Sequence, residues 1–292
     1  MEVCLVVDEE GFACNPNDWT GLENTLKILS DLLEHVRIQR IMRRKSSLLW
    51  EAELWPETCL YNILFDNNCT VDKDILSALG QQLDRVQDWN TEGQAITSRQ
   101  WAKARLNEKQ ATGCVVLSHH EDRQSDLHLV GTECGLLGFY RDAPRLGDMD
   151  AVALIQNGRL AYPNLHFKAD IDKEVRKFSK SYNIIRSSLM QALADLDSFL
   201  PDLLRTYTRE PEDLIRNFQA KSTFEISPES PSTHANKTAM NNREITHNGK
   251  NMSCQWHLKL ERHRDRIHFC WETNARGENN IIIGIFTEHL PT

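Results

Sequence analysis

Short apolar runs alternate with longer amphipathic stretches over roughly the first 145 residues. The short runs are rich in valine, leucine and isoleucine, as buried strands are, and they cover residues 2–7, 57–66, 112–120 and 128–141. The longer stretches place apolar side chains three and four positions apart, which is typical of a helix with one buried face, and they cover residues 20–42 and 72–89. Alternating strands and helices predict an α/β domain.

A different order of elements follows a segment rich in charge, proline and glycine at residues 141–150. Residues 160–170 predict a strand, and residues 171–207 carry two apolar stripes at helical spacing that separate near residues 180–183. The sequence His-Asn-Gly-Lys at residues 247–250 has the composition of a tight hairpin turn. Three further runs are β-branched or alternate apolar with polar positions, as strands do, and they cover residues 254–260, 265–272 and 280–290.

The chain therefore predicts two domains, which fits its length of 292 residues. Residues 1–148 form an acidic α/β domain, and residues 149–292 form an α+β domain with a strand, two helices and a small antiparallel sheet. The net charge of −8 is divided in the same way, since the acidic excess lies in the first part and the second part is close to neutral. We interpret the first domain as a regulatory or sensing unit.

Basic side chains gather in the predicted hairpin at residues 254–272. Successive side chains of a strand point to opposite faces, so His257 and Lys259 share one face and Arg266 and His268 share the face beside it. The opposite face carries tryptophan, leucine, isoleucine and phenylalanine, which belong in the core. The sequence therefore predicts one exposed basic surface, with Arg262 and Arg264 at its rim.

This set of side chains suits the cleavage of RNA without a metal ion. Attack by the 2′-hydroxyl needs a base, an acid for the leaving oxygen and a cation for the charged phosphorane. Imidazoles exchange protons near neutral pH, and arginine and lysine bind phosphate. We expect His257, Lys259, Arg266, His268 and His289 to be catalytic and Arg262 and Arg264 to bind RNA.

Composition and missing motifs argue against several classes of protein and of binding site. No stretch approaches the roughly 18 apolar residues of a membrane span, and the start lacks the basic region of a signal peptide, so we expect a cytoplasmic protein with no membrane partner. None of the eight cysteines forms a Cys-x-x-Cys pair, and no phosphate-binding loop motif is present. The sequence predicts neither a metal site nor a cofactor.

The second part resembles the RelE/ParE/HigB toxin superfamily. The resemblance rests on the order of the strand NLHFKAD, the helices through LADLDSFLPDLL and the ending DRIHFCWETNARGENNIIIGIFTEHL, which contains the family's pattern of Arg-Ile-x-Phe, glycine and isoleucine. It covers about residues 160–292. The chain departs from the family in its near-neutral charge, its longer loop at residues 221–250 and its acidic front domain.

The resemblance implies a function and two site residues. Members of the RelE and HigB type cut mRNA on the ribosome without metal, which implies an endoribonuclease acting in growth arrest or phage defence, with RNA or the ribosome as partner. Arg266 matches the arginine that holds the scissile phosphate, and His289 matches the position of a catalytic tail residue. The front domain then restrains or targets the toxin, in place of or alongside a regulatory protein partner.

Other interpretations stay open. ParE-like relatives cut nothing, so the same sheet face would belong to a non-catalytic protein that docks nucleic acid or a partner protein. Asp8, Glu9 and Glu10 after the first strand, with Asp66, would suit a metal site, although solvated loop acids are the preferred interpretation. The run His119 to Asp122 would begin a ββα-metal nuclease site, but a strand follows where that site needs a helix. Serines near His234 lack the glycine-flanked turn of a serine hydrolase.

Overall fold

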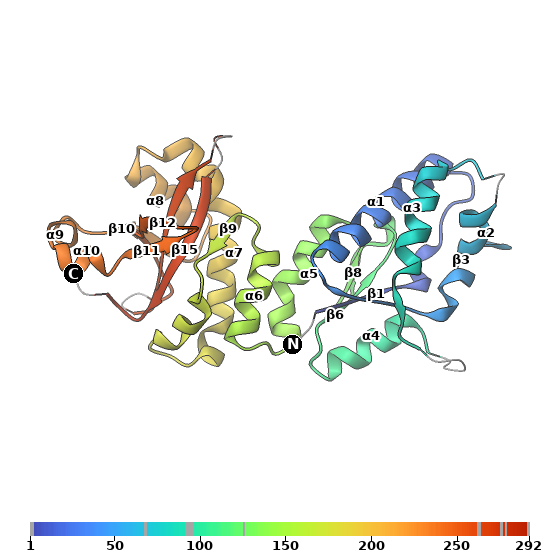
Figure 1. Cartoon of the computed structure of the whole chain (residues 1–292), viewed down its shortest axis with the longest axis horizontal. Coiled ribbons are helices and arrows are strands. Elements are labelled where there is room, and N and C mark those ends of the chain that lie inside the picture. Colours follow the sequence, from blue (N-terminus) through green and yellow to red (C-terminus); the bar gives the residue numbers. More distant parts are fainter. Residues whose placement is uncertain are drawn as a thin grey trace. The chain divides into compact units, whose positions relative to one another are not determined.

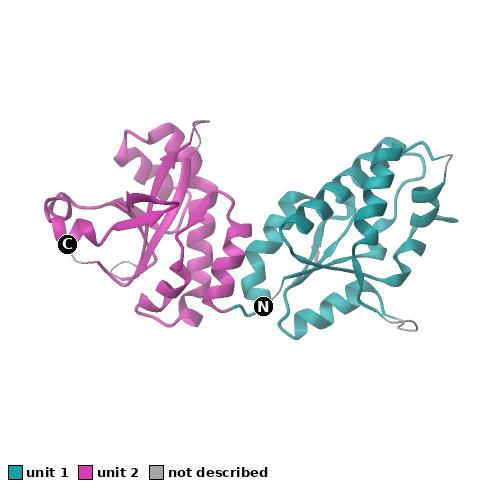
Figure 2. Ribbon diagram, viewed as in Figure 1, with its two compact units in different colours: residues 1–149 teal, residues 150–292 magenta. Residues whose placement is uncertain are grey.

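The computed structural model describes residues 3–66, 69–90, 96–124, 126–261, 264–274, 277 and 279–290, with the side chains of residues 123 and 124 left aside. The chain divides into two compact units, residues 1–149 and residues 150–292, which Figure 2 colours separately. The division lies one residue beyond the boundary predicted from composition. Each unit has its own sheet and its own core.

Unit 1 is built on a mainly parallel sheet with the strand order β5-β2-β1-β6-β8-β7. β7 runs antiparallel to β8, and the other neighbouring strands run parallel. The strands are β1 (Cys4–Val7), β2 (Met42–Lys45), β5 (Gln87–Asp88), β6 (Thr112–Val115), β7 (Asp122–Gln124) and β8 (Leu127–Val130). A small antiparallel ribbon of β3 (Glu53–Trp55) and β4 (Thr58–Cys59) lies outside this sheet.

Helices cover both faces of the unit 1 sheet (Figure 1). They are α1 (Trp19–Ile38), α2 (Leu60–Phe65), α3 (Lys73–Asp84), α4 (Ser98–Asn107) and α5 (Glu133–Leu146), with 3-10 turns η1 (Glu9–Phe12), η2 (Ser47–Glu51) and η3 (Ser118–His120). α4 packs on the face that carries Val6 and Cys114, through Ala102. α5 packs on the opposite face, where an added Cβ at Gly113 would meet Leu5 and Phe139. The parallel sheet between helical layers is the α/β architecture that the sequence predicts.

Two strand predictions in unit 1 are wrong. Residues 57–66 contain only the short β4 and then form α2, whose first residues are fixed by contacts between Cys59 and Asn62. Residues 128–141 leave the sheet after Val130, because Thr132 caps a new helix by accepting from the backbone N–H of Gly135. Helical spacing in α5 buries Leu136, Phe139 and Tyr140, and the residues Gly-Thr-Glu at 131–133 mark the point where the strand ends and the helix begins.

Unit 2 has a mixed sheet with the order β10-β13-β14-β15-β9. Its strands are β9 (Leu165–Phe167), β10 (Glu225–Pro228), β13 (Trp256–Lys259), β14 (Arg266–Thr273) and β15 (Asn279–Thr287), and β11 (Glu244–His247) and β12 (Lys250–Ser253) form a separate hairpin. β9 is parallel to β15, and the other neighbours are antiparallel. The turn of the separate hairpin holds Asn248 and Gly249 at positive φ, as the His-Asn-Gly-Lys sequence predicts.

The helices of unit 2 alternate in sequence with its first strands, since α6 precedes β9, α7 and α8 lie between β9 and β10, and α9 and α10 follow β10 (Figure 1). They are α6 (Ala151–Ala161), η4 (Ile171–Lys177), α7 (Tyr182–Tyr207), α8 (Pro211–Gln219), α9 (Pro231–Ala235) and α10 (Lys237–Asn241). α7 contacts β9 and β15 and buries Leu189, Leu193, Leu196 and Leu200. The first of the two helices predicted in residues 171–207 is a 3-10 helix, and the second passes through Pro201 without ending.

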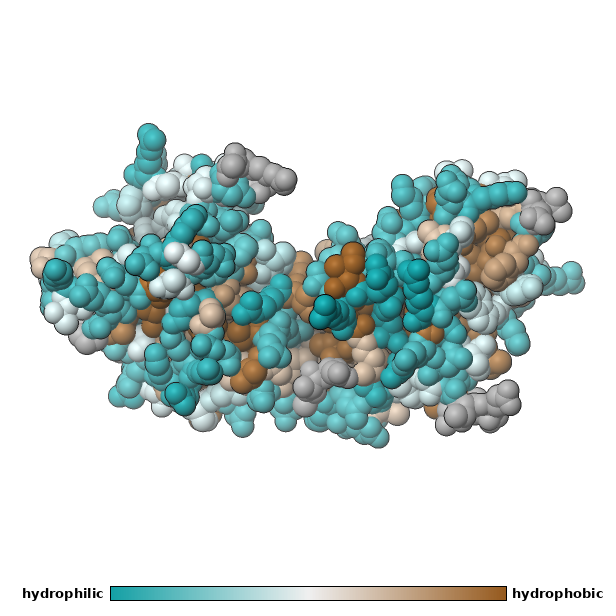
Figure 3. Space-filling view, viewed as in Figure 1, coloured by the Kyte–Doolittle hydropathy of each residue, from teal (hydrophilic) through white to brown (hydrophobic). Residues whose placement is uncertain are grey.

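Surface hydropathy agrees with these two cores. Hydrophilic residues cover most of the face of each unit that Figure 3 shows, with smaller hydrophobic areas between them. Among the described residues, no helix has both the length and the apolar composition needed to cross a bilayer.

Candidate functional site

The predicted basic hairpin forms, and its register brings the predicted residues together. β13 and β14 pair antiparallel with His257 opposite His268 and Lys259 opposite Arg266. All four residues therefore share one sheet face, while Leu258 and Ile267 share the other. The expectation that this face is exposed is wrong, because His268 is 2% exposed and Arg266 is 8% exposed.

The segment between β10 and β11 covers this face. Glu229 follows β10 and is tied to the sheet by its backbone N–H, which donates to the carbonyl of Gln255 at 2.8 Å. Arg243 precedes β11 and accepts at its carbonyl from the N–H of Cys254 at 2.8 Å. Both side chains are buried, so a charged pair lies over the two histidines where the alternating pattern predicts water.

A pocket of about 250 Å³ opens between this segment and the sheet. His257, Arg266, His268 and His289 line it, which brings together four of the five residues predicted to be catalytic. The other lining residues are Ser227, Pro228, Glu229, Ser230, Thr233, Arg243 and Leu290. His289 is exposed and lies two residues beyond β15, so it reaches the pocket from the solvent side.

The remaining predicted residues lie elsewhere. Lys259 lies on the same sheet face, two residues beyond His257, and it does not line the pocket. Its Nζ donates to Glu225 Oε2 at 2.9 Å. Arg264 is exposed, with its Nε 4.0 Å from Glu288 Oε1. Arg262 lies outside the described residues.

Arg266 has a structural task as well as a place in the pocket. Its Nη1 donates to the carbonyl oxygens of Glu261 and Arg264, each at 3.0 Å. These bonds close the turn between β13 and β14, and the next residue back, Asp265, accepts from the N–H and hydroxyl of Ser179 at 2.7 and 2.9 Å. The guanidinium is thus held in position by the turn that carries it.

Glu229 is the centre of the pocket's polar cluster. Its Oε1 lies 3.3 Å from His257 Nδ1, 3.4 Å from His268 Nδ1 and 2.8 Å from Arg243 Nε. All three contacts of this oxygen have ion-pair distance but not hydrogen-bond geometry. His268 is buried, and neither of its ring nitrogens has a hydrogen-bond partner among the residues that the structure describes.

Burial and charge set the protonation of this cluster. Burial lowers the pKa of His268 to about 4, against the opposing influence of Glu229. Burial alone would raise the pKa of Glu229, but His257, His268 and Arg243 outweigh it and hold that pKa well below its usual range. At neutral pH the cluster therefore contains a carboxylate, a guanidinium and a neutral His268 imidazole.

Ser227 completes a chain of contacts through His257. Ser227 and His257 are direct cross-strand partners in β10 and β13, and the Ser227 Oγ lies 3.0 Å from His257 Nε2. The other ring nitrogen of His257 faces Glu229. The contacts thus run from the serine through the histidine to the glutamate, an arrangement that hydrolases use to activate a hydroxyl.

Sequence reasoning missed Glu229 and Arg243, and it considered Ser227 only among the serines near His234 and not as a partner of His257. All three lie in residues 221–250, which the sequence presents as a loop with a hairpin turn. A usable signal was present in the stretch Glu225 to Glu229, where Ile226 alternates with polar residues as in an edge strand. Recognising β10 would have placed Ser227 and Glu229 on one face, although not beside His257.

The alternative acidic site in unit 1 has structural contacts. Asp8 is fully buried and accepts from Arg99 Nε at 2.6 Å, and Glu10 lies 3.3 Å from the same nitrogen. Glu9 accepts from the backbone N–H of Ser98 at 2.8 Å. These acids anchor the start of α4 to the end of β1, and the expectation that they are solvated loop acids is wrong for Asp8, which the ion pair with Arg99 holds in the protein interior.

The run from His119 to Asp122 is also held by local contacts. His119 and His120 each place Nε2 within 2.8 and 2.7 Å of the carbonyl oxygen of Ala13. Glu121 accepts from the hydroxyl of Thr132 at 2.5 Å. β7 follows this 3-10 turn, so the helix that a ββα-metal site requires is not at this position.

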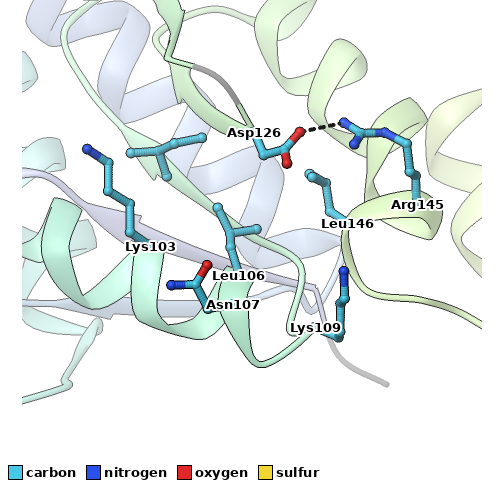
Figure 4. Close-up of a pocket in the computed structure, with 8 residues that line it drawn as sticks. Lys103, Leu106, Asn107, Lys109, Asp126, Arg145 and Leu146 are labelled. Carbon is cyan, nitrogen blue, oxygen red and sulfur yellow. Dashed lines mark hydrogen bonds and ion pairs between the residues drawn. The ribbon is translucent and has the colours of Figure 1, made fainter.

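Unit 1 has a pocket of about 400 Å³ whose chemistry differs from that of the unit 2 pocket (Figure 4). Lys103 and Lys109 approach it from α4 and the residues after it, and Arg145 approaches from α5. Arg145 Nη2 donates to Asp126 Oδ1 at 3.0 Å. The described lining residues include no histidine, so this pocket offers charge but no group that exchanges protons near neutral pH.

Comparison of the chain with protein-family models, with curated proteins and with solved structures gave no match.

Proposed function

We propose that unit 2 is a metal-independent endoribonuclease and that the pocket between β10, β13 and β14 is its active site. The observation that carries the proposal is that His257, His289 and Arg266 all line one pocket. Glu229 lies beside Nδ1 of His257. The resemblance of residues 160–292 to RelE-type toxins agrees in the positions of Arg266 and His289. On this account the substrate is RNA, either free or on the ribosome.

Each side chain has a role that its surroundings support. His257 is the general base: Glu229 faces its Nδ1, and its Nε2 points at the Ser227 hydroxyl, a contact that a substrate 2′-hydroxyl replaces. The exposed His289 protonates the leaving 5′-oxygen at the mouth of the pocket. His268 is buried and neutral, and its Nδ1 lies 3.4 Å from Glu229 Oε1, where it helps to hold the carboxylate in place.

Positive charge stabilises the phosphorane in this scheme. Among the residues that the structure describes, the hydrogen bonds of Arg266 to its turn are made by Nη1, and in this scheme the other nitrogens of the guanidinium bind a phosphate oxygen. A cation held in place before the reaction stabilises developing charge without reorganisation. Lys259 lies outside the pocket. In this proposal its positive charge attracts the RNA backbone as the substrate approaches.

Unit 1 restrains or targets the nuclease in this proposal. It is a compact unit of its own and carries most of the chain's acidic excess. An acidic domain repels RNA and attracts basic surfaces, which suits a regulator better than a second RNA-binding module. Growth arrest or phage defence is the setting in which a restrained RNA-cleaving unit has a use.

The test uses the purified full chain with end-labelled RNA in the presence of a chelator. We expect measurable cleavage by the wild-type full chain, slowed but not abolished where unit 1 restrains it, and a further loss of at least about 100-fold for His257→Asn, the scale of a lost acid or base. His247→Asn is the matched control, since His247 lies on β11 outside this pocket. RNA binding without cleavage by the wild-type protein would instead favour the non-catalytic alternative.

A second candidate function has its own supporting observation. The contacts of Ser227, His257 and Glu229 suit a serine nucleophile that forms a covalent intermediate on an ester. A fluorophosphonate probe tests this function, because it would label the wild-type protein and leave Ser227→Ala unlabelled. Under the ribonuclease proposal the probe labels neither protein.

A further inference from the structure

We infer that Glu229, His257 and His268 form a binding site for a divalent transition-metal ion of the zinc type, and that this ion inhibits the nuclease. The three residues offer a carboxylate oxygen and two imidazole nitrogens, all within 4.8 Å of one another. They come from β13, β14 and the residue after β10. The binding stands on this geometry alone, whereas the inhibition rests on the proposed function.

The two distances from Glu229 to the histidines fit tetrahedral coordination. Zinc lies about 2.0–2.2 Å from nitrogen and carboxylate ligands, which places neighbouring tetrahedral ligands about 3.3–3.5 Å apart. Glu229 Oε1 lies 3.3 Å from Nδ1 of His257 and 3.4 Å from Nδ1 of His268. The ligand nitrogens of the two histidines lie within 4.8 Å of each other, so an ion between them would draw the two imidazoles closer together while Glu229 stays in place.

The buried histidine is the second observation that points to a ligand. His268 is 2% exposed, and its Nδ1 and Nε2 have no hydrogen-bond partner among the described residues. Buried polar nitrogens without a partner cost free energy. Coordination of Nδ1 by a metal ion would satisfy one of them and use the side of the ring that already faces Glu229.

The donor set selects the class of ion. Two imidazoles and one carboxylate suit zinc and its neighbours, whereas magnesium and calcium prefer an oxygen shell. Three protein ligands at the edge of a pocket leave a fourth position for water. Arg243, whose Nε lies 2.8 Å from the same Glu229 oxygen, competes for that charge and makes the site weaker than a structural zinc centre.

Metal binding would remove the proposed base. An imidazole whose Nδ1 is bound to a metal carries its proton on Nε2. Nε2 of His257 is the atom that faces Ser227 and, in the proposed mechanism, the substrate hydroxyl. A protonated Nε2 accepts no proton, so an occupied site and a working active site exclude each other.

The test is a titration of the chelator-treated full chain with Zn²⁺ by isothermal calorimetry, with native mass spectrometry to count the bound ions. We expect one ion per chain, at least about tenfold weaker binding in His257→Asn and His268→Asn, and unchanged binding in His247→Asn. His257 is the safer variant because it is only partly buried. No stoichiometric Zn²⁺, or equal affinity in the wild type and in a folded His257→Asn, would overturn the site.

The inhibition has a separate readout. RNA cleavage should fall as Zn²⁺ occupies the site, with the same midpoint as the titration, and should return on chelation. Binding without inhibition would overturn the regulatory half of the inference. If the protein cleaves no RNA at all, the proposed function fails while the calorimetric titration still decides whether the site exists.

Discussion

Glu229 places its Oε1 3.3 Å from Nδ1 of His257, and it does so from the position directly after β10, the strand that pairs with β13. The contact is possible because Glu229 continues the line of β10 and bonds through its N–H to the residue two before His257. A negative charge at Nδ1 fixes the ring and strengthens Nε2 as a proton acceptor. The position of the segment after β10 therefore determines how well His257 can accept a proton in the pocket.

Replacement of Ser227 separates the two candidate functions. In the ribonuclease account Ser227 only orients His257, so Ser227→Ala should lower kcat/KM for RNA by about tenfold or less, the scale of one lost hydrogen bond. Ser188→Ala is the control, because Ser188 is exposed on α7. Loss of all measurable turnover in Ser227→Ala, with the control unchanged, would contradict the orienting role.

Acid should destabilise unit 2 through His268. Its pKa is lowered from 6.5 to about 4 by burial, so the unfolded chain binds this proton first as the pH falls. The contribution of the neutral histidine to stability is therefore complete above pH 6.5 and is lost between about pH 6.5 and 4, by at most about 3 kcal/mol. Calorimetry over this range should show a smaller decline of Tm in His268→Gln than in the wild type.

The low pKa of Glu229 acts in the same direction at still lower pH. A carboxylate with a lowered pKa stabilises the fold until it is protonated, so its loss begins near its ordinary value of 4.5. An equal decline of Tm in His268→Gln and wild type between pH 6.5 and 4.5 would show that His268 is not the responsible group.

Much of unit 2 could be predicted because its local patterns are unambiguous. Alternation in β13 and β14 fixes which side chains share a face, and the Asn248–Gly249 turn requires the positive φ that its sequence favours. The exposure of that face could not be predicted, since alternation says which residues share a side but not what covers it. The cover comes from residues 229–243, which are distant in sequence and carry no strong periodicity.

Arg266 and Lys259 should differ in their effect on stability, although they are cross-strand partners. Arg266→Met removes two hydrogen bonds from a buried guanidinium to turn carbonyls, and we expect a loss of about 2 kcal/mol or more. Lys259→Met removes a partly exposed ion pair with Glu225 and should cost less than about 1 kcal/mol. Denaturant midpoints measure both, and equal losses would contradict the assignment of Arg266 to the turn.

Two glycines should respond oppositely to alanine. Gly249 has φ +77°, and an added Cβ would meet no atom within 4 Å, so Gly249→Ala should cost about 1 kcal/mol through backbone strain alone. Gly80 in α3 has equally open space and no positive φ, so Gly80→Ala should stabilise the protein by about 0.5–1 kcal/mol. Thermal unfolding of both variants checks the signs, and a stabilising Gly249→Ala would contradict the turn geometry.

The errors in unit 1 have a physical cause that a single sequence conceals. Residues 57–66 and 128–141 mix apolar and polar positions without a clear period, so strand and helix have similar support. The decisive residues are caps: Thr132 begins α5, and Cys59 and Asn62 begin α2. The contacts of Asp8 with Arg99 join positions far apart in the chain, so no local pattern identifies these acids as structural.

The chemical ends of the RNA products test the central claim most directly. Attack by the 2′-hydroxyl with acid–base catalysis leaves a 2′,3′-cyclic phosphate and a 5′-hydroxyl, and needs no metal ion. We predict these ends from the wild-type protein in excess chelator, and at least about 100-fold less product from His257→Asn under the same conditions. Products with 5′-phosphates, formed only when a divalent ion is added, would contradict the account.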